Sequence, residues 1–255
     1  MDITKLVKNK IDAWERSYVT IVEGLDYNPY DTFRRIEFTT NSKYISGQKD
    51  RRGKLKPFYN ILNYRVNIAT RATDIDTKDI QIVADAPQFM ATSFILQKEV
   101  YNWMKDENFA KTLNDMGYTR AKYGGVLVKK CQYKEDGEEE ELEIEVVDWR
   151  NVIVDPINPT DFVIEKHFMT AEDLSEKMDV WDNVKDAMEM ANKCKDGRLE
   201  VYEVHGSFPE SYSPEGGDEY TFKNQCFFIT FKGRAKESTI LYHSFEEETP
   251  YKYLA

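Results

Sequence analysis

The chain is 255 residues long, enough for one large domain or two small ones with a sizeable core. Its formal net charge of -11 argues against a protein whose whole surface grips nucleic acid, because phosphate binding relies on clustered Lys and Arg. A hydrophobic share of 41%, with 13% aromatic residues, argues for packed structure and against disorder throughout.

The cysteines and the apolar runs indicate the compartment. Cys131, Cys194 and Cys226 are widely spaced and odd in number, which fits a reducing compartment better than a disulfide framework. No apolar run approaches the ~20 residues that a helix needs to span a bilayer, and the N-terminus lacks a signal-peptide pattern. We therefore expect a soluble cytoplasmic protein without membrane contact. Because the aromatic segment 251–254 reads as the start of a strand, we also expect the polypeptide to be a fragment.

The N-terminal region is predicted to be helical. Apolar residues recur at helical spacing from Ile3 to Val22, which predicts an amphipathic helix that ends near Gly24. Pro29 predicts a break, and residues 30–45 fit either a second helix or an irregular aromatic segment.

A dense basic run separates this region from the next helix. We expect its side chains to face DNA or an acidic neighbouring surface, although a solvated loop accounts for them equally well. The basic residues are Lys49, Arg51, Arg52, Lys54 and Lys56.

Pro57 then predicts the start of a helix that continues to Ala72, because proline favours a first helical turn.

The central region is predicted to hold a short strand, a long helix and a hairpin. The strand covers residues 80–84, and the helix runs from Phe89 to Tyr123 with a kink near 106–108. Gly124 and Gly125 end the helix, because glycine adopts the left-handed conformation without cost. Two further strands, 126–133 and 142–147, flank a glutamate-rich Asp-Gly turn at 135–141, which we interpret as a solvated hairpin tip.

The last third is predicted to be rich in strands. Thr170 and Asp173 have the spacing of a helix N-terminal cap, and residues 181–191 form a second short helix. The predicted strands are 199–205, 225–232 and 239–245. The fold class is therefore α+β, with long N-terminal helices followed by an antiparallel β-rich region. The expected divisions are a helical and basic segment 1–56, a helical part 57–125, and a β-rich part 126–255 with a helical insertion at 170–192.

Clustered carboxylates give the nearest approach to an enzyme site. Asp148, Asp155, Asp161 and Glu165, with Lys166 beside them, resemble the residues of restriction-type nucleases. Those enzymes place a carboxylate and a lysine two residues apart so that both face the metal, whereas neighbours on a strand point to opposite faces. The spacing therefore disfavours a nuclease.

Other catalytic signals are missing from the sequence. Three carboxylates between a helix and a strand, Asp74, Asp76 and Asp79, are typical of turns and caps. The histidines at 167, 205 and 243 are scattered, without a zinc-ligand spacing, and no glycine-rich phosphate loop lies between a strand and a helix. We predict no catalytic residue, no cofactor and no metal ligand.

The order of the elements resembles the N-terminal half of tailed-phage portal proteins. The shared order is a long helix ending in Tyr123-Gly124-Gly125, a strand, an acidic hairpin, the segment 149–156, a helix start at 170–174, and a β-meander. The helix around 58–64 extends the similarity upstream. The order as a whole is similar to that of portals from crAss-like phages. The resemblance covers about residues 55–255 and is one of order, with degenerate motifs.

The resemblance implies a structural virion protein without catalytic residues. Portal subunits usually form dodecameric rings at the capsid vertex, around a channel for double-stranded DNA. The implied partners are other copies of the chain, the major capsid protein, the terminase and a head-tail adaptor. The stem, clip and crown expected after the wing have no counterpart before Ala255, so this chain corresponds to the wing. The alternatives are a metal-dependent nucleic-acid-processing enzyme using Asp148, Asp155 and Glu165, or a stand-alone interaction module.

Overall fold

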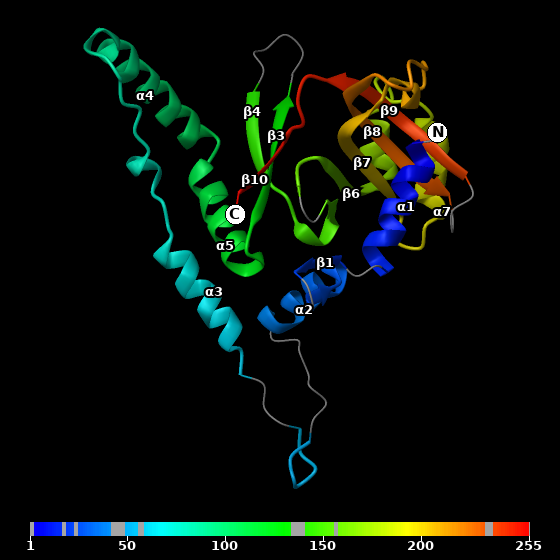
Figure 1. Ribbon diagram of the computed structural model, residues 1–255, viewed down its shortest axis with the longest axis horizontal. Helices are drawn as coiled ribbons and strands as arrows, with labels where there is room; N and C mark the ends of the chain where they lie inside the picture. The colour runs from blue at the N-terminus through cyan, green and yellow to red at the C-terminus, as the bar shows by residue number, and fades with distance from the viewer. Residues whose placement is uncertain are drawn as a thin grey trace. The chain divides into compact units, whose positions relative to one another are not determined.

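The protein folds as two compact units built from separate parts of the chain. Unit 1 comprises Met1–Thr32 with Asp148–Tyr251, and unit 2 comprises Phe33–Val147 with Lys252–Ala255. The expected divisions at 56/57 and 125/126 both fall inside unit 2. The computed structural model describes residues 3–16, 19–22, 25–41, 49–55, 59–133, 141–155, 158–232 and 237–254 (Figure 1). Within these residues, helices and antiparallel strands confirm the α+β class.

Unit 1 is organised around a five-stranded sheet of order β5-β6-β7-β8-β9, in which every neighbouring pair is antiparallel. Three of these strands include the segments predicted from sequence, and each is longer than predicted. The strands are β5 Val152–Val154, β6 Phe162–Thr170, β7 Arg198–Pro209, β8 Phe222–Lys232 and β9 Glu237–Glu246.

Helix α1 (Ile3–Arg16) covers one face of this sheet (Figure 1). Its Ile3 and Val7 side chains are buried in a cluster with Ile164 of β6 and Val204 of β7. The predicted extension of this helix to Gly24 is wrong. The β-branched residues of the segment Val19–Val22 favour an extended backbone, and that segment pairs as β1 with β2 (Leu25–Tyr27).

The opposite face is covered at one end by α6 (Ala171–Ser175) and α7 (Val184–Lys193). Leu174 and Ala187 are buried there against Val201 of β7. The predicted cap is confirmed, because the Thr170 hydroxyl accepts from the Asp173 N–H and the Asp173 carboxylate accepts from the Thr170 N–H. The rest of this face carries the polar cluster described below.

Unit 2 combines helices with a three-stranded sheet of order β10-β3-β4. The N-terminal helices of the chain are shorter than predicted, since α1 has 14 residues and the next two have 12 each. The other elements are α2 Pro29–Thr40, which begins in unit 1, α3 Ile61–Ala72, α4 Met90–Asp106, α5 Phe109–Tyr123, β3 Val126–Tyr133, β4 Glu141–Val146 and β10 Tyr251–Leu254. None of the described helices is both long and apolar enough to span a membrane.

Asparagine side chains decide where two of these helices begin. Asn28 Oδ1 accepts from the Asp31 N–H at 3.0 Å, so Pro29 lies in the first turn of α2 and starts that helix. Asn60 does the same for α3 through the Asn63 N–H. The described helix therefore begins at Ile61, and Pro57, which was predicted to open it, lies outside the described residues.

The predicted kink in the long helix is a complete break. Asn108 has φ of +49°, in the left-handed region, and separates α4 from α5. At the other end of α5, Gly124 has φ of +86° and its N–H donates to the Arg120 carbonyl, as predicted for a glycine cap. The β3–β4 hairpin is also confirmed, while the acidic tip at 134–140 lies outside the described residues.

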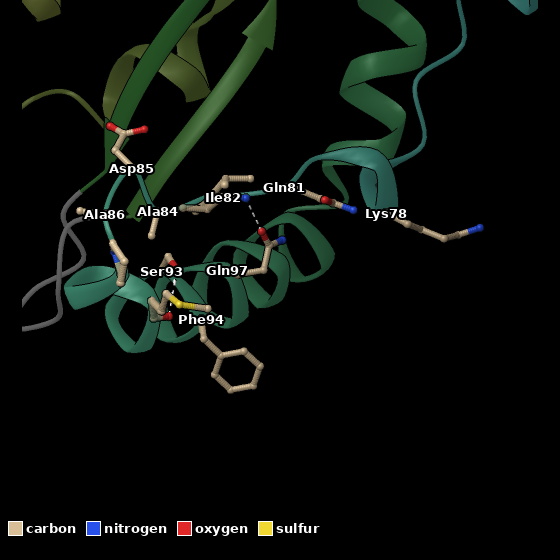
Figure 2. Close-up of a pocket in the computed structure, with 12 residues that line it drawn as sticks. Lys78, Gln81, Ile82, Ala84, Asp85, Ala86, Ser93, Phe94 and Gln97 are labelled. Carbon is tan, nitrogen blue, oxygen red and sulfur yellow. Dashed lines mark hydrogen bonds between the residues drawn. The ribbon is translucent and has the colours of Figure 1, made fainter.

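The predicted strand at 80–84 is wrong. This segment is extended, but a side chain supplies the hydrogen bonds that a neighbouring strand would supply. Gln97 of α4 accepts from the Ile82 N–H at 2.5 Å (Figure 2). It also donates to the Ile80 carbonyl at 3.0 Å. One amide group thus satisfies two backbone groups of the segment.

Candidate functional site

A cluster of titratable side chains lies on the sheet face of unit 1 that α1 does not cover. Two of the contributing strands each place two polar residues two positions apart, which puts both on the same face. These pairs are Glu165 and His167 on β6, and Glu203 and His205 on β7. Antiparallel register sets Glu165 opposite Glu203, so the two pairs adjoin.

His205 is the centre of the cluster and is 2% exposed. Its Nε2 lies 2.8 Å from Oε1 of Glu203, and its Nδ1 lies 2.8 Å from Oε2 of Glu246 on β9. Both ring nitrogens therefore face carboxylates, which fixes the ring orientation. The Tyr251 ring packs edge-on against the imidazole, with centroids 5.3 Å apart.

This environment favours a charged imidazole. Burial by itself opposes protonation, but the hydrogen bonds to Cys226, Glu203 and Glu246 outweigh it and raise the pKa of His205 to about 11. Burial raises the pKa of the Cys226 thiol, so the thiol is neutral at pH 7. Without a bound cation, the imidazolium is therefore held between two carboxylates.

Cys226 of β8 completes the buried part of the cluster. It lies opposite His205 in the β7–β8 register, is 3% exposed, and its Sγ is 3.6 Å from Nε2 of His205. Glu203, at 4% exposure, sits beside the same nitrogen. A thiol, an imidazole and a carboxylate therefore converge in a site shielded from water.

Glu203 also connects this group to a more exposed one. Its Oε2 is 2.7 Å from Nε2 of His167, and Glu165 Oε2 is 3.9 Å from the same nitrogen. The Tyr251 hydroxyl donates to Glu165 Oε2 at 2.7 Å. Within the described part of the chain, two groups place three metal-ligand atoms within 4.8 Å of one another: Glu203, His205 and Cys226, and Glu165, His167 and Glu203.

The carboxylates that resemble nuclease residues are held locally. Asp148 forms an ion pair with Arg150, Asp155 accepts from the Asn158 N–H, and Asp161 accepts from the Asn158 side chain. Neither three-ligand group in the described residues contains any of the three. Only Glu165 belongs to the cluster.

Glu165 and Lys166 point to opposite faces of β6, as predicted. Glu165 reaches Tyr251 and His167, whereas Lys166 lies opposite Tyr202 and lines a small hollow with it on the face that α1 covers. The Glu165 carboxylate and the Lys166 ammonium group therefore cannot both face one metal site on the same side of the sheet.

The other singled-out polar residues have structural partners. Asp76 caps the 3-10 turn Thr77–Asp79 by accepting from the Lys78 N–H, which supports the prediction that it is a cap. His243 lies beside Gln225, with Nε2 3.1 Å from Oε1, and packs on Phe227. Burial lowers the pKa of His243, so this ring is neutral at pH 7.

The basic run lies in an exposed turn of unit 2. Its backbone closes through a bridge between Lys49 and Leu55, and Asp50 Oδ1 accepts from the Arg52 and Lys54 N–H groups, each at 2.8 Å. Lys49, Arg51, Arg52 and Lys54 are exposed, and Lys56 lies outside the described residues. The turn presents its positive charge to solvent.

No protein-family model matches this chain, and no curated protein matches it. The chemistry of the cluster therefore has to be judged from its own geometry.

The sequence contains a signal for the cluster that differs from the usual zinc-ligand spacings. Glu-x-His occurs at 165–167 and again at 203–205, each within a predicted or apparent strand. The period of a strand places both residues of each pair on one face. Cys226 and Glu246 join these pairs because of how the strands align with one another in the sheet. The spacing of residues along the sequence does not reveal that alignment.

A second concave feature lies in unit 2, between the segment 78–87 and α4. Figure 2 shows Gln97 of α4 reaching the backbone of this segment, while Phe94 points away from it. The groove is lined largely by apolar atoms, with Lys78 and Asp85 as its charged residues. It offers a surface for packing and lacks a convergent set of catalytic groups among its lining residues.

Proposed function

We propose that the chain is a structural subunit of a homo-oligomeric assembly, the wing portion of a phage portal ring. The observation that carries the proposal is a series of large apolar side chains exposed along α3, α4 and the segment between them in unit 2. Monomeric proteins rarely expose contiguous apolar patches above a few hundred Å², and larger ones are typical of interfaces. We call this set the apolar helix surface: Tyr59, Ile61, Leu62, Tyr64, Ile68, Ile75, Val83, Phe89, Met90, Phe94, Ile95, Leu96 and Tyr101.

The exposure of these side chains is high for their size. Ile61 is 61% exposed, Phe94 is 63% exposed and Val83 is 78% exposed. At roughly 25 cal/mol per Å² of apolar surface removed from water, covering such a surface gives assembly a strong driving force. The groove beside Phe94 and Val83 offers a place for a side chain of the next copy.

A ring of identical subunits uses two different surfaces of each copy at every interface. The apolar helix surface would then meet another part of the neighbouring subunit. The order of elements that resembles portal wings supports this arrangement, and with it a dodecameric ring at the capsid vertex. In that setting the partners would be the major capsid protein, the terminase, the head-tail adaptor and the DNA in the channel.

The exposed basic turn is the candidate DNA contact in this assembly. Charge on an exposed turn can approach phosphates without any rearrangement of the core. Replacing Lys49, Arg51, Arg52, Lys54 and Lys56 by Gln should weaken DNA binding and flatten its salt dependence, because fewer counterions are released. Equal affinity and salt slope in the two proteins would remove the turn from the DNA contact.

The assembly itself is tested by native mass spectrometry and sedimentation of the wild type and two variants. Ile61→Asp with Phe94→Asp places charge on the apolar helix surface, and should shift rings toward monomers. Val180→Asp is the matched control, since Val180 is 68% exposed in unit 1 and lies outside this surface. A wild type that stays monomeric over a wide concentration range would refute the proposal.

A further inference from the structure

We propose that Glu203, His205 and Cys226 bind a divalent transition metal, with Zn²⁺ as the best match. The site is separate from the apolar helix surface, and its existence does not depend on ring assembly. Three ligand types that zinc accepts in proteins, a thiolate, an imidazole nitrogen and a carboxylate oxygen, meet at one point of the sheet.

The backbone brings the ligands together without any special loop. His205 and Cys226 are directly opposite each other on β7 and β8, and Glu203 precedes His205 by two positions on the same face. Both β7 and β8 lie inside the sheet, so the ligand positions are held by hydrogen-bonded strands on both sides. Ligands on rigid strands keep the geometry that a metal requires.

A tetrahedral centre requires one of the two known ligand–ligand distances to change little and the other to open slightly. Zinc–nitrogen bonds of about 2.0–2.1 Å and zinc–sulfur bonds of about 2.3 Å place neighbouring ligand atoms about 3.3–3.6 Å apart. The His205 Nε2 to Cys226 Sγ distance is 3.6 Å. The Nε2 to Glu203 Oε1 distance is 2.8 Å and would open by about half an ångström as the metal replaces the proton between them.

Neighbouring side chains form hydrogen bonds that orient the candidate ligands, as is usual around metal sites. Metal-bound histidines usually donate the second ring N–H to a carboxylate, which orients the ring. Here Glu246 Oε2 is 2.8 Å from Nδ1 of His205, so Nε2 is the nitrogen that faces Cys226 and Glu203. The second oxygen of Glu203 is 2.7 Å from His167, which fixes the carboxylate in turn.

Proton and charge balance favour a dication at this point. Zn²⁺ would replace the proton on Nε2 and the thiol proton of Cys226, so two protons are released for each ion bound. The bound ion would then be ligated by two anionic side chains and one neutral imidazole. Sulfur and nitrogen ligands select zinc over magnesium or calcium, which prefer oxygen.

The neighbouring group of Glu165, His167 and Glu203 is a weaker candidate. It has no sulfur ligand, and the Tyr251 hydroxyl already donates to Glu165 Oε2 at 2.7 Å. Its His167 nitrogen is 3.9 Å from Glu165 and 2.7 Å from Glu203, a less even spacing. We therefore assign the metal to the thiolate group.

Cobalt substitution tests the assignment directly. Tag-free full-length protein, freed of metal and titrated with Co²⁺, should show a thiolate-to-cobalt charge-transfer band and the visible bands of tetrahedral cobalt at one equivalent. Elemental analysis after Zn²⁺ loading should give one zinc per chain. Cys226→Ser should lose the charge-transfer band, whereas Cys194→Ser, a half-buried cysteine at the end of α7, should keep it.

Two further variants keep the test informative if Cys226→Ser fails to fold. A chain with Cys226 as its sole cysteine, made by Cys131→Ser and Cys194→Ser, should retain the band. Glu246→Gln leaves all three ligands in place and should weaken zinc affinity by about 10–100-fold. Absence of the band in both the wild type and the sole-cysteine protein would overturn the proposal and leave His205 as an imidazolium held by two carboxylates.

Discussion

The hydroxyl of Tyr251 donates a 2.7 Å hydrogen bond to Oε2 of Glu165, and the Tyr251 side chain has no exposed surface. Burial, together with the nearby carboxylates of Glu203 and Glu165, raises the pKa of this phenol well above its usual value. The hydroxyl therefore stays protonated and acts as a donor throughout the physiological range. This bond ties the end of unit 1 to the polar face of its sheet.

Tyr251→Phe should lower the free energy of unfolding by about 1–2 kcal/mol, because the partly buried Glu165 carboxylate loses its donor. Tyr220→Phe is the matched control, since Tyr220 is 88% exposed, and it should change stability by less than about 0.5 kcal/mol. Urea denaturation of both variants measures the difference. Equal stabilities of the two variants would mean that the hydrogen bond contributes nothing net.

Substitution by alanine should have opposite effects on stability at two glycines of unit 2. A Cβ at Gly125 would lie 2.5 Å from the Tyr253 hydroxyl oxygen, so Gly125→Ala must displace β10 or the tyrosine. At Gly117, inside α5, the nearest atom would be 3.9 Å away, and alanine should stabilise the helix by about 0.5–1 kcal/mol.

Thermal unfolding of Gly117→Ala and Gly125→Ala checks the signs. We expect the melting temperature to rise for the first and fall for the second. Adding Tyr253→Ala to Gly125→Ala should recover part of the loss, because the clashing ring is gone. A double variant no more stable than Gly125→Ala would show that Tyr253 is not the obstacle.

Gln97 should control the backbone of the segment 80–84. Gln97→Leu keeps most of the side-chain volume but removes the acceptor for the Ile82 N–H and the donor for the Ile80 carbonyl. Hydrogen exchange at the Ile82 amide should become at least tenfold faster, corresponding to about 1.4 kcal/mol of lost protection.

Gln81→Leu serves as the control for this measurement, since it alters a neighbouring residue that lines the same groove. It should leave exchange at Ile82 close to the wild-type rate. If Gln97→Leu also leaves that rate unchanged, the amide is protected by something other than Gln97.

His243 should make the free energy of unfolding depend measurably on pH. Burial lowers its pKa below the unfolded value of 6.5, so the unfolded chain binds the proton more readily than the folded chain. The stabilising contribution is therefore present above pH 6.5 and is lost as the pH falls through the folded pKa.

Chemical denaturation of the wild type and His243→Gln between pH 7.5 and about 5 tests this sign. The wild type should lose more stability on acidification than the variant does. Parallel curves for the two proteins would contradict a lowered pKa at this position.

Local chemistry made some elements predictable from sequence. Thr170 and Asp173 carry the whole signal for their cap within four residues, and Gly124 ends α5 for a reason that involves only its own backbone. The segment 80–84 was misassigned because its hydrogen-bond partner is the side chain of Gln97, which does not belong to a strand. The pattern of residues within the segment does not reveal a hydrogen-bond partner on a helix.

The candidate site needed information of a different kind. Alternation along a strand already implied that Glu203 and His205 share a face, and likewise Glu165 and His167. Their convergence on Cys226 and Glu246 follows from strand register across four strands, and register is set by the hydrophobic face and the connections together. For adjacent Glu165 and Lys166, by contrast, the two-residue period of a strand is enough to predict that their side chains point to opposite faces of the sheet.

The packing of α1 on the five-stranded sheet has a consequence for synthesis of the chain. Ile3 and Val7 are translated long before Phe227 and Ile229, which belong to the same buried cluster. All of unit 2 before Lys252 is translated between these two sets of residues. The buried cluster around α1 can therefore be completed only after β8 has been translated. Contacts so distant in sequence slow folding, and they make the nascent first helix a natural client for chaperones.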